Sequence, residues 1–162
     1  KRALWLLSSA VWKKIKSPLL SKLWENVVNS RNLLLFGSKI SSHSSQETWS
    51  IGCEIGKTLP RGSVLCFYGN LGSGKTTLIQ GIVFSLTGIS EVPSPTFTYV
   101  QAYPNEVYHY DLYRLSEETE FLARGLDEPF GTTAICLIEW PERIPSLLPK
   151  HAQEIRISHA CN

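Results

Sequence analysis

The residues best suited to chemistry form a glycine-rich run that ends in a lysine and two threonines. GNLGSGKTT at 69–77 matches the spacing G-x-x-x-x-G-K-[ST] of phosphate-binding loops. Glycines let a short turn curl so that successive backbone N–H groups and a helix N-terminus face an anion. Lys75 would reach the β- and γ-phosphates, and the Thr76 hydroxyl would coordinate Mg²⁺. The run predicts a nucleoside triphosphate site whose cofactor-binding residues are Asn70, Leu71, Gly72, Ser73, Gly74, Lys75, Thr76 and Thr77.

The segments around this run follow the order that such a loop requires. Residues 63–68 are apolar and β-prone, which predicts a buried strand, and apolar residues recur at helical spacing from the loop to Gly88. Before the strand, Ser44 and Glu47 have the form of a capping box and predict the start of a helix. The strand, loop and helix of a nucleotide-binding unit are therefore all expected.

The second half of the chain predicts further strands. The β-prone runs 98–103 and 107–111 flank a turn and indicate an antiparallel hairpin, and Ser116 opens a short helix. Residues 134–138 are apolar without alternation, which favours a central strand, whereas 154–158 alternate as an edge strand would. We expect an α/β fold, a P-loop NTPase three-layer sandwich with a mixed, mainly parallel sheet.

Two acids at strand ends are candidates to hold the metal. Glu139 closes the most apolar strand, which should run parallel to the loop strand and end beside the phosphates. Asp111 closes the hairpin strand, whose direction is less defined by the sequence. Either acid could instead be a solvated strand end. We expect Glu139 to serve Mg²⁺ together with Thr76.

Two further features border the expected site. In residues 93–98, two prolines restrict the backbone and two hydroxyls lie close together, one of them that of Thr96. This is typical of a switch segment that senses the γ-phosphate, or of a rigid connector. Trp140 could shield the site from water or pack at the rim of the core. His109 lies between two tyrosines in a predicted strand, which favours a structural role.

The sequence also indicates which base is bound. No N-K-x-D sequence is present to read guanine, so ATP is preferred over GTP.

Charge is distributed unevenly along the 162 residues. Residues 1–40 hold eight Lys or Arg and one acid, Glu25, whereas the remainder holds eight Lys or Arg and thirteen acids. We expect residues 1–41 to be a basic, poorly ordered extension and residues 42–162 to be the ATPase domain. The extension could instead lie on a membrane surface, act in targeting or contact RNA.

The composition bears on the cellular compartment, on membrane insertion and on the number of domains. The four cysteines show neither C-x-x-C spacing nor a histidine cluster, which favours reduced thiols in a cytoplasmic protein. No apolar run approaches the roughly 18 residues that a membrane span requires. With 43% apolar residues the chain can bury one core, so we expect a single α/β domain.

Several motifs together resemble the TsaE (YjeE) family. They are GNLGSGKTT at 69–77, SPTFT at 94–98, HYDLYRL at 109–115, GLDE at 125–128 and IEWP at 138–141, in family order. The resemblance covers about residues 45–158 and is far more specific than a phosphate loop alone. The basic leader is not a family feature, and relatives usually continue beyond the last strand, which leaves the adenine contacts open.

The resemblance implies a bacterial ATPase needed to make N6-threonylcarbamoyladenosine in tRNA. It implies that the chain acts with TsaD and TsaB, which perform the transfer, and contacts tRNA only indirectly through them. It also implies roles for single residues: Lys75 on the phosphates, Thr76 and Glu139 on Mg²⁺, and Thr96 and Asp111 in the switch region. Trp140 matches a family tryptophan beside the site. The implied activity is a weak, Mg²⁺-dependent ATPase that its partners stimulate.

Two other functions fit the same loop. A small-molecule kinase would need arginines in a mobile lid, and only Arg114 and Arg124 lie between the loop and Glu139. A nucleotide-gated interaction module would bind its partners without essential hydrolysis.

Overall fold

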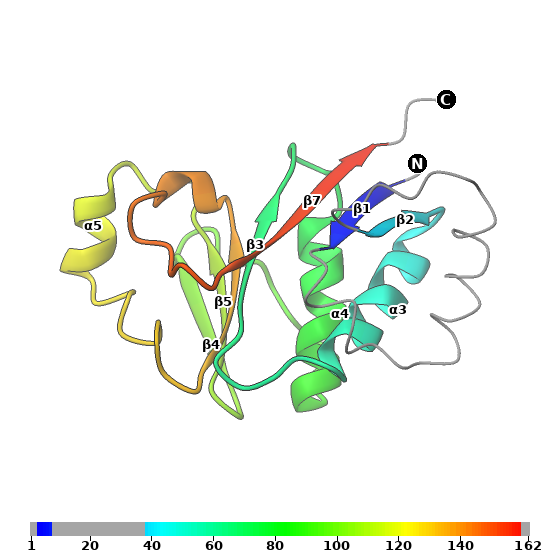
Figure 1. Cartoon of the computed structure of the whole chain (residues 1–162), viewed down its shortest axis with the longest axis horizontal. Helices are drawn as coiled ribbons and strands as arrows, with labels where there is room; N and C mark the ends of the chain where they lie inside the picture. The colour runs from blue at the N-terminus through cyan, green and yellow to red at the C-terminus, as the bar shows by residue number, and fades with distance from the viewer. Residues whose placement is uncertain (1–2, 8–37, 160–162) are drawn as a thin grey trace.

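The computed structural model describes residues 3–7 and 38–159. The strands are β1 (Ala3–Leu7), β2 (Ser38–Ser42), β3 (Val64–Tyr68), β4 (Val100–Tyr103), β5 (Val107–Asp111), β6 (Ile135–Glu139) and β7 (Gln153–His159). The helices are α3 (Ser45–Gly56), α4 (Lys75–Thr87) and α5 (Glu118–Ala123), with a 3₁₀ turn η1 (Pro141–Arg143). All seven strands join one sheet in the order β2-β1-β7-β3-β6-β5-β4 (Figure 1).

Four neighbouring strands, β7, β3, β6 and β5, run parallel in the middle of this sheet. The hairpin strand β4 is antiparallel to β5 at one side, and β1 is antiparallel to β7 at the other. The mixed, mainly parallel sheet confirms the expected fold class. Parallel strands place their carboxyl ends at one edge, which is where ligands bind in open α/β sheets.

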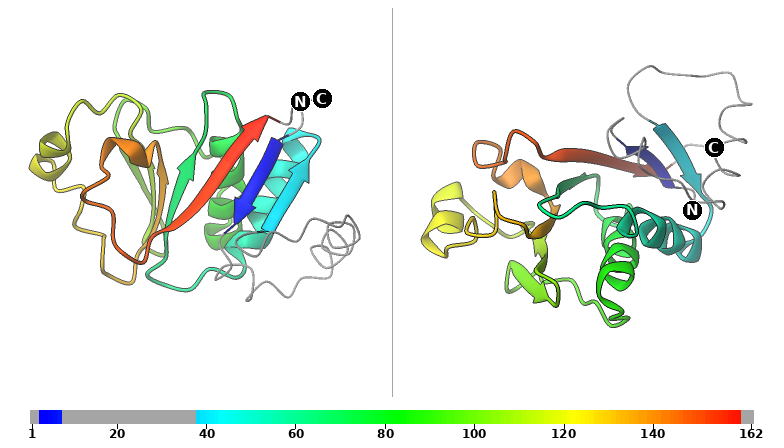
Figure 2. Two further views of the ribbon diagram at one scale, coloured as in Figure 1. Left: turned by 45° about the horizontal axis from the view of Figure 1, so that its top comes forward. Right: turned by 60° about the horizontal axis from the view of Figure 1, so that its bottom comes forward.

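Helices and loops cover the two faces of the sheet. Helices α3 and α4 lie across one face, where buried side chains such as Ile51 and Leu78 pack against the strands (Figures 1 and 2). On the other face, Phe121 of α5 and Ile144 after η1 pack against Tyr110 of the sheet. Because both faces are covered, all five residues of β6 are buried, as expected for a central strand.

Local sequence signals set the ends of the helices. The Ser44 Oγ accepts from the Glu47 backbone N–H at 3.1 Å, and the Glu47 carboxylate accepts from the His43 N–H at 2.6 Å, so the predicted helix start is confirmed. Helix α4 ends at Gly88, whose φ of 78° suits glycine. The short helix α5 begins at Glu118, two residues beyond the expected Ser116.

The last strand differs from the prediction. Residues 154–158 were expected at a sheet edge, but β7 lies between β3 and β1. Its side chains alternate because one face is exposed, and alternation does not distinguish a half-exposed inner strand from an edge strand.

The expected poorly ordered extension contains the strand that covers β7. Within residues 1–41, Ala3–Leu7 forms β1, and most of β2 follows at Ser38–Ser42. Figure 2 shows β1 beside β7, with β2 on the other side of β1. Residues 8–37 lie outside the described part of the chain, so the expectations about their basic charge stay predictions. The boundary at residue 42 remains a prediction.

Three cysteines, Cys53, Cys66 and Cys136, are free and buried. Burial raises the pKa of the Cys66 and Cys136 thiols to about 12, so both stay protonated near neutral pH. No helix in the described ranges has the length and apolar character needed to cross a membrane.

Candidate nucleotide-binding site

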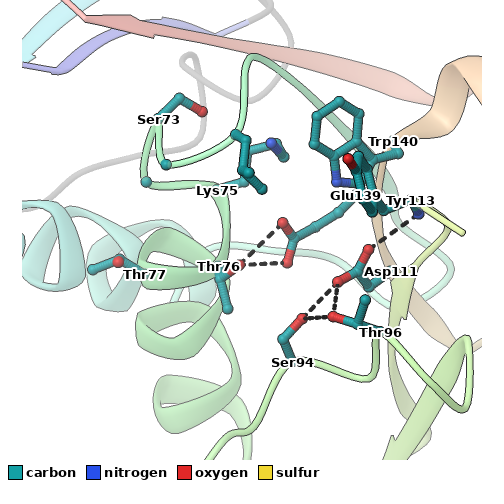
Figure 3. Close-up of a pocket in the computed structure, with 13 residues that line it drawn as sticks. Ser73, Lys75, Thr76, Thr77, Ser94, Thr96, Asp111, Tyr113, Glu139 and Trp140 are labelled. Atoms are coloured by element: carbon teal, nitrogen blue, oxygen red, sulfur yellow. Dashed lines mark hydrogen bonds between the residues drawn. The ribbon is translucent and has the colours of Figure 1, made fainter.

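The glycine-rich loop leaves the end of β3 and leads into α4. A side chain at Gly69 would place its Cβ 2.3 Å from the Ile157 carbonyl oxygen of β7, so only glycine lets the loop pass this close. Gly74, directly before α4, has a φ of 102°. A cavity of about 310 Å³ opens above the loop (Figure 3). It is lined by residues 71–77 and by Ser94, Thr96, Asp111, Tyr113, Glu139 and Trp140.

Lys75 points into this cavity from the first turn of α4. Only 4% of the residue is exposed, and its Nζ donates to the carbonyl oxygens of Gly69 at 2.7 Å and Asn70 at 3.2 Å. The ammonium also lies 4.0 Å from the centre of the Trp140 ring. Burial lowers the pKa of Lys75, and the nearby Glu139 carboxylate opposes this shift.

Thr76 meets Glu139 across the cavity. The Thr76 hydroxyl lies 2.9 and 3.1 Å from the two carboxylate oxygens of Glu139. This contact forms because β3 and β6 are parallel neighbours, so the loop after β3 and the acid at the end of β6 reach the same edge of the sheet. Glu139 is 2% exposed and therefore belongs to the cavity wall rather than to a solvated strand end.

Asp111 stands beside Glu139 on the neighbouring strand. The two acids are register partners at the ends of the parallel strands β5 and β6. The Asp111 Oδ2 accepts from the hydroxyls of Ser94 and Thr96, each at 2.6 Å, and the Tyr113 backbone N–H donates to Oδ1 at 3.2 Å. The segment after α4 is thus tied to the second acid, as Figure 3 shows.

The cavity suits a phosphate group and a hard cation. The Ser73 Oγ is buried and has no hydrogen-bond partner among the described residues, and Gly72 faces open space. The polar groups that face the cavity opposite the loop are hydroxyl and carboxylate oxygens, which Mg²⁺ prefers. Within the described residues, no group of three His, Cys, Asp or Glu side chains is placed to hold a metal alone. This donor set fits Mg²⁺ that is held by few protein oxygens together with phosphates.

Trp140 both packs and lines the cavity. Its ring lies 5.0 Å from that of Tyr113 and contacts the core on the α5 side of the sheet, while its other neighbour is the Lys75 ammonium. Trp140 has a φ of 59°, a left-handed conformation that costs about 1–2 kcal/mol for a side chain with a Cβ. The turn after β6 therefore holds the indole over the loop at some cost in stability.

The structure brings most of the predicted site residues together. All of them line the cavity except Asn70, which contributes its carbonyl oxygen to Lys75. Thr77 lines the cavity but points away from Glu139 (Figure 3).

Sequence reasoning missed three neighbours of the acids. Ser94 and Tyr113 lie inside the motifs SPTFT at 94–98 and HYDLYRL at 109–115. Their position within these motifs was the signal that could have identified them as site residues. His109, expected to be structural, contacts the Glu139 carboxylate at 2.9 Å. Its place two residues before Asp111 on the same strand face is the signal that could have found it.

A phosphate-binding loop at the end of one parallel strand, with an acid at the end of the next, defines the P-loop NTPase fold. The crystal structure of YdiB from Bacillus subtilis matches this chain with a TM-score of 0.62 and 32% sequence identity, over 75% of this chain and 76% of that one. The family model described as "Threonylcarbamoyl adenosine biosynthesis protein TsaE" matches residues 42–162. The chain belongs to the TsaE family.

Individual relatives are similar over much of the same region. The tRNA threonylcarbamoyladenosine biosynthesis protein TsaE of Treponema pallidum is 37% identical over 118 residues, 72% of this chain and 87% of that protein. The proteins of the same name from Synechocystis and Bacillus subtilis are 43% and 42% identical. Those matches span 59% and 61% of this chain, and 65% and 63% of the relatives.

Proposed function

We propose that this chain binds ATP with Mg²⁺ and hydrolyses it slowly, as the ATPase component of the machinery that makes N6-threonylcarbamoyladenosine in tRNA. The observation that carries the proposal is the contact between the Thr76 hydroxyl and the Glu139 carboxylate above the loop. It joins the two groups that a Mg²⁺-dependent phosphate site needs, from segments 63 residues apart. Membership of the TsaE family supports the link to tRNA modification.

Each polar group has a part in this proposal. The loop amides and Lys75 would bind the phosphates, with Lys75 leaving the carbonyl oxygens that it now contacts. Thr76 and Glu139 would hold Mg²⁺, which when bound neutralises charge on the phosphate oxygens during transfer. Glu139 is also the acid that contacts the loop directly, through Thr76, so we assign it a catalytic role in orienting water.

The segment that contains Thr96 would act as the switch. Ser94 and Thr96 now donate to Asp111. A γ-phosphate or its metal would compete for these hydroxyls and for the acid, so the segment would take a different position when ATP is bound. Asp111 would hold the segment in place when the γ-phosphate is absent.

The remaining parts of the proposal concern partners and location. We infer that TsaD and TsaB family proteins bind this chain, that tRNA contacts it only through them, and that it acts in the cytoplasm.

A small-molecule kinase is less well supported, because neither arginine available for a lid lines the cavity. Arg114 lies over the Phe97 ring, and Arg124 pairs with Glu120 at 2.9 Å.

Two variants test the site. We expect Lys75→Ala to weaken ATP binding by about 10- to 100-fold, because a charge-assisted contact to phosphate is lost. Glu139→Ala should retain ATP binding in part and lose about 100-fold in hydrolysis, because charge organisation in the transition state is removed. Binding is measured by calorimetry and hydrolysis by phosphate release, with and without TsaD and TsaB.

Exposed ion-pair residues provide matched controls for both variants. Lys57→Ala and Glu154→Ala remove exposed partners of surface ion pairs and should leave binding and hydrolysis unchanged. Wild-type hydrolysis in both site variants would overturn the site assignment. A rate that TsaD and TsaB leave unchanged would overturn the partner assignment alone.

A further inference from the structure

Glu139 has a second side-chain neighbour besides Thr76. The His109 Nε2 lies 2.9 Å from Oε1 of Glu139, and the exposed fractions of the two side chains are 0% and 3%. A buried polar side chain is costly unless it is hydrogen-bonded, so this pair is a specific feature of the core and not a surface encounter.

The strand register explains how the histidine reaches the acid. Strand β5 pairs in parallel with β6, so that His109 is opposite Leu137 and Asp111 is opposite Glu139. Residues two apart on a strand lie on the same face, which places His109 one step below Asp111 and within reach of Glu139. The ring therefore approaches Glu139 from the interior of the sheet, whereas Thr76 approaches from the loop.

The hydrogen bonds on Glu139 are unequal. Among the described residues, Oε1 has hydrogen bonds with both His109 and Thr76, whereas Oε2 has one with Thr76 alone, at 3.1 Å. The His109 Nδ1 is buried and has no partner among the described residues. We therefore assign the Nε2–H tautomer, in which the ring donates to Oε1 and only a lone pair is left unpaired. Within the part of the chain that the structure describes, the one polar contact of this ring is therefore with the acid.

We propose that His109 is a positioning residue that fixes Oε1 of Glu139, so that Oε2 and the Thr76 hydroxyl oxygen stay directed toward the metal. This inference rests on the proposed function. Without the ring, the carboxylate could turn within the cavity wall, where the Lys75 ammonium is the opposite charge nearby. A carboxylate that turned away from Thr76 would no longer be directed at a bound Mg²⁺, while the contacts of the loop with the phosphates would remain.

Two substitutions separate positioning from packing. His109→Gln keeps an N–H that can donate to Oε1, and His109→Leu fills similar space without a donor. We expect His109→Leu to lose about tenfold or more of the gain in ATP affinity that Mg²⁺ provides, as happens when groups that orient metal ligands are removed. His109→Gln should keep most of that gain, and neither variant should change ATP affinity in EDTA.

Val107→Ala is the matched control. Val107 lies on the same strand and face, is fully buried and lines no part of the cavity. Its loss should lower the melting temperature and leave the gain from Mg²⁺ intact. Calorimetric titration of the full chain with ATP, in Mg²⁺ and in EDTA, measures the gain, and thermal unfolding measures stability.

The outcomes distinguish this inference from the proposed function. A gain from Mg²⁺ that is unchanged in His109→Leu would overturn the inference alone. An equal loss of affinity in Mg²⁺ and in EDTA would also overturn it, because the histidine would then be structural. A wild-type chain whose ATP affinity does not respond to Mg²⁺ would overturn the proposed function, and this inference with it.

Discussion

Lys75 of the loop is suited to binding a ligand, and its burial lowers the stability of the nucleotide-free chain. Lys75 carries a charge into a site with 4% exposure, where two carbonyl oxygens and an aromatic ring replace water. The lowered pKa of Lys75 has the same cause, since burial disfavours the charged form. A binding residue of this kind is retained for what it binds rather than for stability.

We therefore expect Lys75→Met to stabilise the nucleotide-free chain. Methionine is of similar length and carries no charge, so the free energy of unfolding should rise by about 1 kcal/mol while ATP binding weakens by about 10- to 100-fold. Urea unfolding without nucleotide measures the change, and Lys57→Met, at an exposed site, should have little effect. A lower free energy of unfolding for Lys75→Met would show that the carbonyl contacts outweigh the cost of burial.

At the scale of elements, two glycines set how closely α3 and α4 pack. A Cβ at Gly52 would lie 2.2 Å from the Leu78 carbonyl oxygen, and one at Gly81 would lie 2.0 Å from the Trp49 carbonyl oxygen. These contacts are to backbone, which cannot rotate away. The close approach fixes α4, and with it the loop at its N-terminus, against the rest of the domain.

Gly81→Ala should invert the usual effect of this substitution. In an exposed helix interior, alanine is about 1 kcal/mol more favourable than glycine. Here the added methyl group must push α3 from α4, so we expect the free energy of unfolding to fall by about 1–3 kcal/mol. Chemical denaturation measures it, with Ser50→Ala on α3 as the control. A stabilised Gly81→Ala would mean that the helices separate at no cost.

At the scale of the whole molecule, the nucleotide site and the N-terminal strands occupy different parts of one sheet. The site draws on the ends of β3, β5 and β6 and on α4, whereas β1 pairs with β2 and β7. Strand β1 covers the backbone of β7, which would otherwise be an open edge.

Disrupting β1 should therefore affect stability and not ligand binding. Leu6→Pro removes a backbone donor from a strand paired on both sides, and we expect the free energy of unfolding to fall by about 1–3 kcal/mol. ATP affinity, measured by calorimetry, should stay within about threefold of wild type, because no strand of the site changes its partner. Leu6→Val is the control. Loss of ATP binding at wild-type stability would contradict this separation.

The loop and the elements next to it were predictable because their signals are local. Glycine spacing, the Ser44 cap and the apolar periodicity of α4 act over a few residues and do not depend on the rest of the chain. The hairpin and the central strand were predictable for the same reason. The inner position of β7 was not, because its partner β1 lies at the opposite end of the sequence.

The sequence by itself determined that a phosphate-binding loop lies between a buried strand and a helix, and that Glu139 and Asp111 end two strands. Only the tertiary structure decided that these acids are neighbours in register, that Ser94 and Thr96 bind Asp111, and that His109 binds Glu139. The physical reason is the range of the forces involved. Backbone preferences act between neighbours along the chain, whereas strand order and side-chain contacts depend on which distant segments pack together.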